Sequence, residues 1–494
     1  MSAIDLYDLA VLGSGEAGKY LAWTLSKAGQ RIALVERSMV DGSCPNVACL
    51  PSKNIIHSAK VASLARRGAE FGLELGSMSL NMAGVQDRKR RMVDALIKIH
   101  LDRYEASGVE LIMGLGRFVS PKTISITLNG GGERVITADR VVLSLGTHAS
   151  VPTVPGLVDV SPMTHVQALD LERVPPHLVV IGGGYIGLEL AQAIRRFGSR
   201  LTVIERGPQL ASREDPDVGA ALLELFRDEG IEVMLNATLT SVEGRSGERI
   251  RVNVGHPEGA CAIEATDLLI AAGRTPNTDG IGLELAGVEV DARGNIVVNE
   301  RLETTAADVW AVGDCAGSPQ FTHVAYDDFR IVRDNLAGGY RTTRERLVPF
   351  RGCRTWWSHT SAAAASSVSF CMFTDPELAR VGLNETEAKR RGLSYRVAKM
   401  PMAAVLRTRT LSEPRGLIKM LIEEAGDRIL GFSAFGAEAS EMMATVQTAM
   451  LGHLPFTVLR DALFTHPTAT EGLTVLLADV ASRESDRTAR QSAS

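Results

Sequence analysis

Two cysteines with four residues between them are the most informative feature of this sequence. Cys44 and Cys49 lie in the segment GSCPNVACLPSK at residues 42–53. Two thiols at this spacing can take up electrons from a bound redox cofactor. Free cysteines are also common as small core residues, so the pair alone does not distinguish redox chemistry from packing. The neighbouring segments decide between these interpretations.

The cysteine pair follows a pattern of strand, glycine-rich turn, helix and strand that occurs twice in the chain. The first copy has strands at 8–12 and 31–35, a helix to about residue 28, and the residues Gly13, Gly15, Gly18 and Glu36. The second copy has strands at 178–181 and 201–204, a helix to about residue 197, and the residues Gly182, Gly184, Gly187 and Glu205. In both copies the acid lies 23 residues after the first glycine.

This spacing is typical of dinucleotide-binding units. The glycines permit a tight turn, a close approach of pyrophosphate and close helix packing, and the helix N-terminus attracts the phosphates. The acid accepts hydrogen bonds from a ribose. Two copies in the same context therefore predict two bound dinucleotides.

The two copies need not hold the same ligand. The first lies beside the cysteines and is expected to hold a flavin, which links hydride donors to thiols. The second is then expected to hold the nicotinamide donor. Glu205 favours NAD(H) because its charge repels a 2′-phosphate. Arg206 beside it leaves NADP(H) as an alternative.

Length and composition restrict the class of protein. A chain of 494 residues is too long for one core and predicts two to four domains. The net charge of −5 does not suggest a nucleic-acid partner. We expect neither a signal peptide nor a membrane-spanning helix, because no apolar stretch of about 18 residues occurs. Six scattered cysteines favour a reducing, cytoplasmic compartment.

Residues 42–53 resemble the redox-active motif of the class I FAD-dependent pyridine nucleotide-disulfide oxidoreductases, a family that includes lipoamide dehydrogenase, glutathione reductase and mercuric reductase. The usual pattern begins Gly-Gly-Thr-Cys and has glycine before the second cysteine. This chain differs at Asp41, Ser43 and Ala48. None of these differences removes a reacting atom, and the resemblance covers about residues 5 to 478.

Further segments are similar to the same family. Residues 308–314 resemble its second flavin motif, which implies that Asp314 binds the ribitol chain. Gly273 lies in a segment similar to the strand leaving the NAD domain, and Gly146 occupies the place of the family's Ala-Thr-Gly glycine. The resemblance also implies that Ser43 and Lys53 lie in the flavin site.

The resemblance implies an α/β fold with two Rossmann-like dinucleotide-binding domains and a C-terminal α+β dimerisation domain. We expect a discontinuous FAD-binding domain at 1–150 and 283–345, an NAD(P)-binding domain at 151–282, and a dimerisation domain at 346–480. An insertion at 351–369 is expected to be a surface loop, since its Cys353 and His359 are too few ligands for a metal site. The polar tail at 481–494 is expected to be disordered.

His466 and Glu471 resemble the family's acid/base motif, in which the histidine reaches the active site of the other subunit. The resemblance therefore implies a homodimer with His466 acting in trans. It also implies that Lys53 pairs with Glu189 near the flavin, and that Tyr185 covers the nicotinamide pocket.

The implied reaction passes hydride from NADH through FAD to a Cys44–Cys49 disulfide, with Cys49 against the flavin and Cys44 attacking the substrate. Positions i and i+5 of a straight helix are about 8.5 Å apart, which exceeds the roughly 7 Å limit for a disulfide. The helix must therefore begin irregularly. Because Cys44 precedes a proline suited to a first helical turn, we expect it to have a lowered pKa.

The sequence leaves several substrates as alternatives. Dihydrolipoyl dehydrogenase fits best, with a disulfide substrate and a 2-oxoacid dehydrogenase complex as a potential partner. A mercuric-reductase-like reductase of metal ions or oxidants is the main alternative, although no cysteine follows Cys371 to supply that enzyme's C-terminal pair. A flavoprotein redox sensor or complex subunit is a further one.

Overall fold

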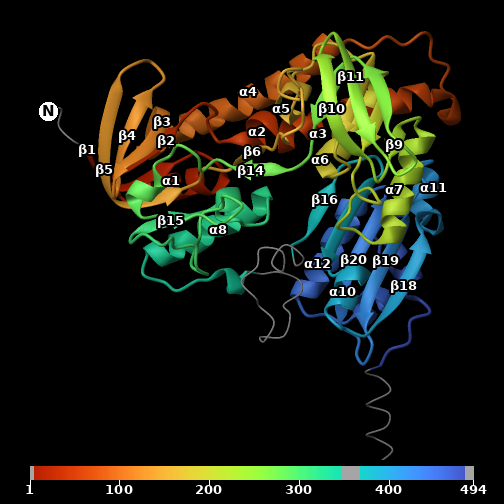
Figure 1. The fold of residues 1–494 in the computed structure, drawn as a ribbon. Helices are drawn as coiled ribbons and strands as arrows, with labels where there is room; N and C mark the ends of the chain where they lie inside the picture. Colours follow the sequence, from red (N-terminus) through yellow and green to blue (C-terminus); the bar gives the residue numbers. More distant parts are fainter. Residues whose placement is uncertain (1–4, 347–367, 484–494) are drawn as a thin grey trace, which may run out of the picture.

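The computed structural model describes residues 5–346 and 368–483. Most of the predicted insertion at 351–369 and most of the predicted tail at 481–494 lie outside the described residues. The described chain forms three units, each built around a β-sheet (Figure 1).

The first unit is built on a mainly parallel sheet. Strand β1 (Asp5–Leu12) pairs in parallel with β2 (Ile32–Glu36) and with β5 (Glu133–Leu143), and α1 (Glu16–Lys27) connects β1 to β2. Strand β3 (Glu110–Ser120) extends the sheet beyond β2, and β15 (Val309–Ala311) extends it beyond β5. The long strands β3 and β5 also pair antiparallel with β4 (Thr123–Leu128).

The cysteine motif lies on helices that follow β2 of this sheet. Three of them lie between β2 and β3, namely α2 (Ser43–Val47), α3 (Cys49–Arg66) and α4 (Met82–Ser107). Helix α8 (Thr322–Leu336) follows β15 and packs on α1.

The second unit repeats the parallel pattern. Its sheet has the order β13-β7-β8-β9, formed by β13 (Asp267–Ile270), β7 (His177–Ile181), β8 (Arg200–Ile204) and β9 (Glu232–Met234). Helix α6 (Tyr185–Phe197) joins β7 to β8, and α7 (Pro216–Asp228) joins β8 to β9. An antiparallel sheet of β10 (Thr238–Arg245), β11 (Arg249–Gly255) and β12 (Cys261–Ala265) lies before β13. Strands β6 (Thr147–Ala149) and β14 (Arg274–Pro276) pair where the chain enters and leaves this unit.

The third unit is an antiparallel sheet of order β16-β17-β20-β19-β18. Its strands are β16 (Phe370–Met372), β17 (Glu377–Gly382), β18 (Tyr395–Pro401), β19 (Leu417–Glu423) and β20 (Ile429–Gly436). Its helices are α10 (Glu385–Arg390), α11 (Leu406–Thr410), α12 (Ala439–Leu451), α13 (Phe456–Asp461) and α14 (Gly472–Leu477). Short helical segments elsewhere are α5 (His165–Ala168), η1 (Gly68–Phe71), η2 (Leu283–Ala286), η3 (Gly313–Ala316), η4 (Thr343–Glu345) and η6 (Met402–Ala404).

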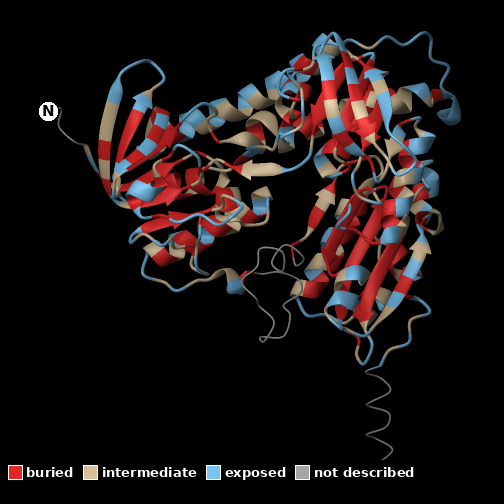
Figure 2. Ribbon diagram, viewed as in Figure 1, coloured by how far each residue is buried: buried red, intermediate tan, exposed pale blue. Residues whose placement is uncertain are grey.

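One hydrophobic cluster joins all three units. It contains Ile55 of α3, much of α6 and α7, and Leu378 and Phe435 of the antiparallel sheet. Figure 2 shows the buried residues concentrated on the central strands of each sheet. A contiguous buried core of this kind fixes the three units relative to one another.

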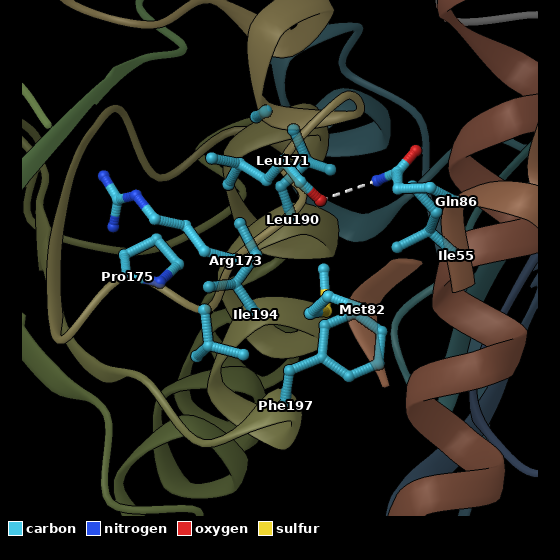
Figure 3. Close-up of a pocket in the computed structure, with 11 residues that line it drawn as sticks. Ile55, Met82, Gln86, Leu171, Arg173, Pro175, Leu190, Ile194 and Phe197 are labelled. Carbon is cyan, nitrogen blue, oxygen red and sulfur yellow. Dashed lines mark hydrogen bonds between the residues drawn. The ribbon is translucent and has the colours of Figure 1, made fainter. Parts of the chain in front are cut away.

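A small apolar cavity lies where α4 meets the second unit (Figure 3). Ile55, Met82, Ile194 and Phe197 are among its lining residues, and Gln86 Nε2 donates to the Leu171 carbonyl at 2.8 Å. The residues that line it include no cysteine, histidine or carboxylate, so this cavity belongs to domain packing and not to the chemistry.

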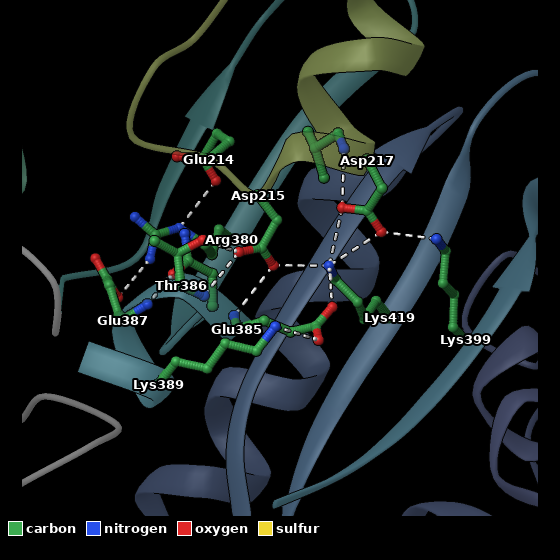
Figure 4. A network of polar contacts seen from close by, with 12 residues as sticks. Glu214, Asp215, Asp217, Arg380, Glu385, Thr386, Glu387, Lys389, Lys399 and Lys419 are labelled. Atoms are coloured by element: carbon green, nitrogen blue, oxygen red, sulfur yellow. Dashed lines mark hydrogen bonds and ion pairs between the residues drawn. The ribbon is translucent and has the colours of Figure 1, made fainter. Parts of the chain in front are cut away.

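A buried charge network joins α7 to the third unit (Figure 4). Lys419 is 0% exposed and its Nζ contacts Asp215 at 2.7 Å, Glu385 at 2.9 Å and Asp217 at 3.0 Å. Burial alone would lower the pKa of Lys419, but the hydrogen bonds to Asp215, Glu385 and Asp217 raise it. The network ties the second unit to β19 and α10.

Candidate active site

The two cysteines lie on either side of a helix break. Cys44 is in α2, Cys49 begins α3, and Ala48 between them has φ −136° and ψ −104°. The predicted irregular helix start is therefore confirmed. Both residues are thiols in this structure, and Thr322 Oγ1 lies 3.3 Å from each sulfur. Thr322 begins α8, so a distant segment completes the thiol site.

The electrostatics distinguish the two thiols. The hydrogen bond from Cys44 lowers the pKa of Cys49 to about 6 against the effect of burial, and Thr322 and Lys53 lower it further. The same hydrogen bond, together with burial, raises the pKa of Cys44 above its usual value. The predicted low pKa of Cys44 is therefore wrong. Cys44 is half-buried and donates to its neighbour, whereas Cys49 occupies the N-terminus of the long helix α3, where a thiolate is stabilised.

Lys53 and Glu189 form the predicted pair. Lys53 Nζ lies 2.7 Å from Glu189 Oε2, and the other carboxylate oxygen accepts from the Phe373 N–H at 2.7 Å. Lys53 also lies over the Phe373 ring, 4.9 Å from its centroid. Glu189, on α6, thus connects α3 to the third unit. Its partner Lys53 lies one helical turn after Cys49 on α3. The predicted place of Glu189 beside a flavin stays a prediction.

The first glycine turn has the close backbone approach that a dinucleotide needs. A Cβ added to Gly13 would lie 2.3 Å from the Ser144 carbonyl oxygen, and one added to Gly18 would lie 2.3 Å from the Gly13 carbonyl oxygen. Gly15 is the residue before α1, so the unpaired N–H groups at the N-terminus of α1 lie at the glycine turn. Glu36 Oε2 accepts from Ser14 N–H at 3.0 Å, which holds the acid at the turn. This cradle fits the pyrophosphate and ribose of FAD.

The second turn has the same construction. Cβ atoms at Gly182 and Gly187 would lie 2.4 Å and 2.2 Å from backbone oxygens, whereas one at Gly184 would meet nothing within 4 Å. Glu205 accepts from the N–H groups of Gly183 and Gly207, both at 2.7 Å. The acid is thus fixed at the turn, and the open face at Gly184 leaves room for a pyrophosphate.

Tyr185 begins α6 beside this second turn. Its ring stacks on Phe370 at 5.0 Å, and its hydroxyl donates to Glu214 at 2.8 Å. Phe370 stacks in turn against Phe321 at 6.1 Å, the residue before Thr322. Two ring contacts therefore connect Tyr185 to the residue that precedes Thr322. The predicted role of Tyr185 over the nicotinamide pocket stays a prediction.

Asp314 and the two remaining predicted glycines lie where the first and second units meet. Asp314 Oδ2 accepts from Thr147 Oγ1 at 2.7 Å, and Arg274 Nε donates to the same hydroxyl at 2.7 Å. Gly146 and Gly273 have φ values of +64° and +137°, which favour glycine. Ser43 is the first residue of α2.

His466 pairs with Glu471 as predicted, with Nδ1 2.9 Å from Oε1. The histidine side chain is 62% exposed, and the polar contacts of the two sulfurs within the described residues do not include it. A histidine that is oriented by a carboxylate yet exposed in the single chain is consistent with a role at another subunit's site.

Sequence reasoning missed Thr322, Phe373 and Thr147. Each follows or precedes a recognisable motif, but none carries a residue type that points to chemistry by itself. Thr322 comes eight residues after Asp314, and its contact with cysteines more than 270 residues away depends on the packing of α8.

No helix within residues 5–346 and 368–483 is long and apolar enough to cross a membrane. No group of three or more histidine, cysteine or carboxylate residues in the same ranges is arranged to hold a metal ion.

Comparison with known proteins gives consistent matches. Residues 7–328 match the family model described as pyridine nucleotide-disulphide oxidoreductase, and residues 368–476 match the dimerisation domain of the same family. The chain is 34% identical to the probable pyridine nucleotide-disulfide oxidoreductase RclA of Escherichia coli (strain K12), over 95% of this chain and 98% of RclA. It is 33% identical to a mercuric reductase of Acidithiobacillus ferrooxidans, over 94% of this chain and 81% of that enzyme.

A solved structure agrees with these sequence matches. The Cu(II) complex of the HOCl-induced flavoprotein disulfide reductase RclA from Escherichia coli superimposes with a TM-score of 0.85 at 31% identity, covering 97% of this chain and 100% of RclA.

Proposed function

This chain belongs to the pyridine nucleotide-disulfide oxidoreductase family, and we propose that it uses NADH to keep Cys44 and Cys49 reduced for the reduction of a soft metal ion. The family is FAD-dependent and uses NAD(P)H, its fold has two Rossmann-like domains and a C-terminal α+β domain, and the dimerisation domain supports a homodimer.

The observation that carries the proposal is the asymmetric thiol pair. Cys49 has a pKa lowered to about 6 by Cys44, Thr322 and Lys53, so it is a thiolate at neutral pH. Bound FAD would accept an electron pair from NADH and supply it to the cysteine pair. The residues that would hold FAD are Gly13, Gly15, Gly18, Glu36, Ser43, Lys53, Gly146 and Asp314.

Two observations support a metal ion as the electron acceptor, namely the preference of thiolates for soft ions and the relatives of this chain. Thiolates are the preferred ligands of soft ions such as Cu(I). RclA has been solved as a Cu(II) complex, and another relative is a mercuric reductase. In each turnover the Cys49 thiolate and the Cys44 thiol become one disulfide and release one proton, and the two electrons convert two Cu(II) ions to two Cu(I) ions. Glu205 supports NADH as the donor.

The second candidate acceptor is a small disulfide such as lipoamide. The His466–Glu471 pair favours it, because a leaving thiolate needs a proton and a metal ion does not. The names of these relatives give no support to a 2-oxoacid dehydrogenase complex, so the proposal does not include one. The expected cytoplasmic location stays a prediction.

Anaerobic NADH oxidation by the FAD-loaded enzyme, with Cu(II), Hg(II) or lipoamide as acceptor, tests the proposal. We expect turnover with Cu(II) that is lost in Cys44→Ser and Cys49→Ser. We expect His466→Gln to reduce lipoamide turnover about 100-fold and to leave Cu(II) turnover near the wild-type rate. Equal Cu(II) turnover in wild type and both cysteine variants would contradict the proposal, and lipoamide turnover far above Cu(II) turnover would favour the second candidate.

A further inference from the structure

Asp41 is a buried acid where the family motif has glycine. It is 1% exposed and has φ +70°, and Gly42 after it has φ +71°. A non-glycine residue in this left-handed region is strained and persists where the surroundings hold it in place. A glycine would avoid that strain, so the contacts of the Asp41 side chain are what holds the backbone in this conformation.

Both oxygens of the Asp41 carboxylate are occupied by helix α4. Oδ2 contacts His100 Nδ1, and Oδ1 accepts from the Tyr104 hydroxyl at 2.8 Å. These two residues are one helical turn apart and therefore lie on the same helix face. The Asp41 N–H donates to Ser14 Oγ at 2.7 Å. Asp41 thus joins α4 to the first glycine turn.

The cluster is packed against α1. The Trp23 ring lies 5.4 Å from the His100 ring and 5.1 Å from the Tyr104 ring. Trp23 is itself buried. Burial and the charge of Asp41 raise the pKa of Tyr104, so its hydroxyl remains a donor. This packing leaves the Asp41 carboxylate with fixed partners on α4.

The segment that follows Asp41 needs an anchor. Helix α2 has 5 residues, too few for a helix to be stable by itself. At its other end, Asn46 Nδ2 donates to the carbonyls of Val40 and Gly42, both at 2.7 Å. Asp41 is three residues before Cys44, so the position of that thiol depends on how the start of α2 is held.

We propose that Asp41, together with His100 and Tyr104, is a positioning device for the redox-active pair, which fixes the start of α2 against α4 and so keeps Cys44 beside Cys49. The inference rests on the proposed function in one respect, namely that these two cysteines are the reacting pair. It does not depend on which acceptor they reduce.

The test is the rate at which iodoacetamide alkylates Cys44 in the reduced, FAD-loaded protein, followed by peptide mass spectrometry. Asp41→Gly removes the carboxylate and suits the backbone conformation. We expect it to raise the Cys44 rate about 10-fold, the factor that corresponds to losing a hydrogen bond to a charged group. Tyr104→Phe and His100→Gln each remove one partner and are expected to give smaller increases.

Tyr7→Phe is the matched control. The Tyr7 hydroxyl also donates to a carboxylate, that of Glu110, at 2.5 Å in the same domain, but it does not touch the redox segment. We expect this variant to leave the Cys44 rate unchanged. A wild-type rate in Asp41→Gly would overturn the proposal, as would an increase in Tyr7→Phe equal to that in Tyr104→Phe.

The remaining variants keep the test decisive. If Asp41→Gly does not fold, wild-type rates in both Tyr104→Phe and His100→Gln also overturn the proposal. Alkylation requires no acceptor, so failure of the Cu(II) assay and failure of this positioning role give separate results.

Discussion

Thr322 is the residue whose contribution to the thiol site can be isolated most cleanly. Its hydroxyl lies 3.3 Å from both sulfurs and lowers the pKa of Cys49 alongside Cys44 and Lys53. A hydrogen bond to a charged group is worth about 1.5–3 kcal/mol. Thr322→Val should therefore raise the pKa of Cys49 by about 1 to 2.

The measurement is the pH dependence of Cys49 alkylation in the reduced protein, which has its midpoint at the pKa of the thiol. Since the wild-type pKa is about 6, the reactive thiolate should persist to lower pH in wild type than in Thr322→Val. Thr322→Ser keeps the hydroxyl and should behave like wild type. Coincident profiles for the valine and serine variants would show that the hydroxyl does not stabilise the thiolate.

Glu205 is the residue expected to select the nicotinamide donor. Its carboxylate is held by two backbone N–H groups at 2.7 Å, so its charge cannot swing away from a 2′-phosphate. Glu205→Gln removes the charge and keeps an acceptor. We expect the ratio of kcat/KM for NADH to that for NADPH to fall about 5-fold, because two unit charges about 4 Å apart interact by about 1 kcal/mol in water. An unchanged ratio would assign the selection to other residues.

At the level of elements, the charge network between α7 and the third unit predicts an acid-sensitive contact. Burial would raise the pKa values of Asp215 and Asp217, but hydrogen bonds lower both. The hydrogen bond comes from Lys419 at Asp215, and from Lys399 and then Lys419 at Asp217. Groups with depressed pKa values stabilise the fold above their unfolded value of about 3.9. That stabilisation is lost as the pH falls through the lower, folded values.

Lys419→Met should destabilise the protein by about 3–5 kcal/mol, because it leaves the buried carboxylate of Asp215 without its ion-pair partner. Lys399→Met is the matched control. Lys399 contacts Asp217 at 2.7 Å but is 45% exposed, so we expect a loss below about 1 kcal/mol. Thermal unfolding at fixed FAD concentration, repeated between pH 7 and pH 3, compares the two. The Lys419 variant should also lose less further stability in acid than wild type, and equal losses in the two variants would contradict this account.

The elements that the sequence predicted well are those specified locally. Both glycine turns, their strands and acids, and the break between Cys44 and Cys49 depend on residues close in the chain, and all are present. The pKa of Cys44 was predicted wrongly, because a local argument about its proline could not include the hydrogen bond to Cys49. Thr322, Phe373 and Lys419 act through contacts across units, which periodicity and motif spacing do not encode.

At the level of the whole molecule, the three units meet around one short segment. Cys49 and Lys53 are on α3, Glu189 is on α6, Phe373 lies beside β16, and the hydroxyl of Thr322 comes from α8. The shared hydrophobic cluster holds these elements in register. His466 stands apart in the single chain, exposed and oriented by Glu471, so the complete site is expected to need a second copy.

Mixed dimers test this directly. In a dimer of one Cys44→Ser subunit and one His466→Gln subunit, a site built in trans would combine the intact cysteines of the second subunit with the intact histidine of the first. Each parent homodimer should keep about 1% of the wild-type lipoamide rate or less. The mixed dimer, isolated with two affinity tags after coexpression, should recover about half of the wild-type rate, since one of its two sites is intact. A dimer of wild type with the Cys44→Ser/His466→Gln double variant is the control, because each of its sites would lack one group and should be inactive. If His466 acted within its own chain, the results would reverse: the first mixed dimer would be inactive and the control would retain one working site.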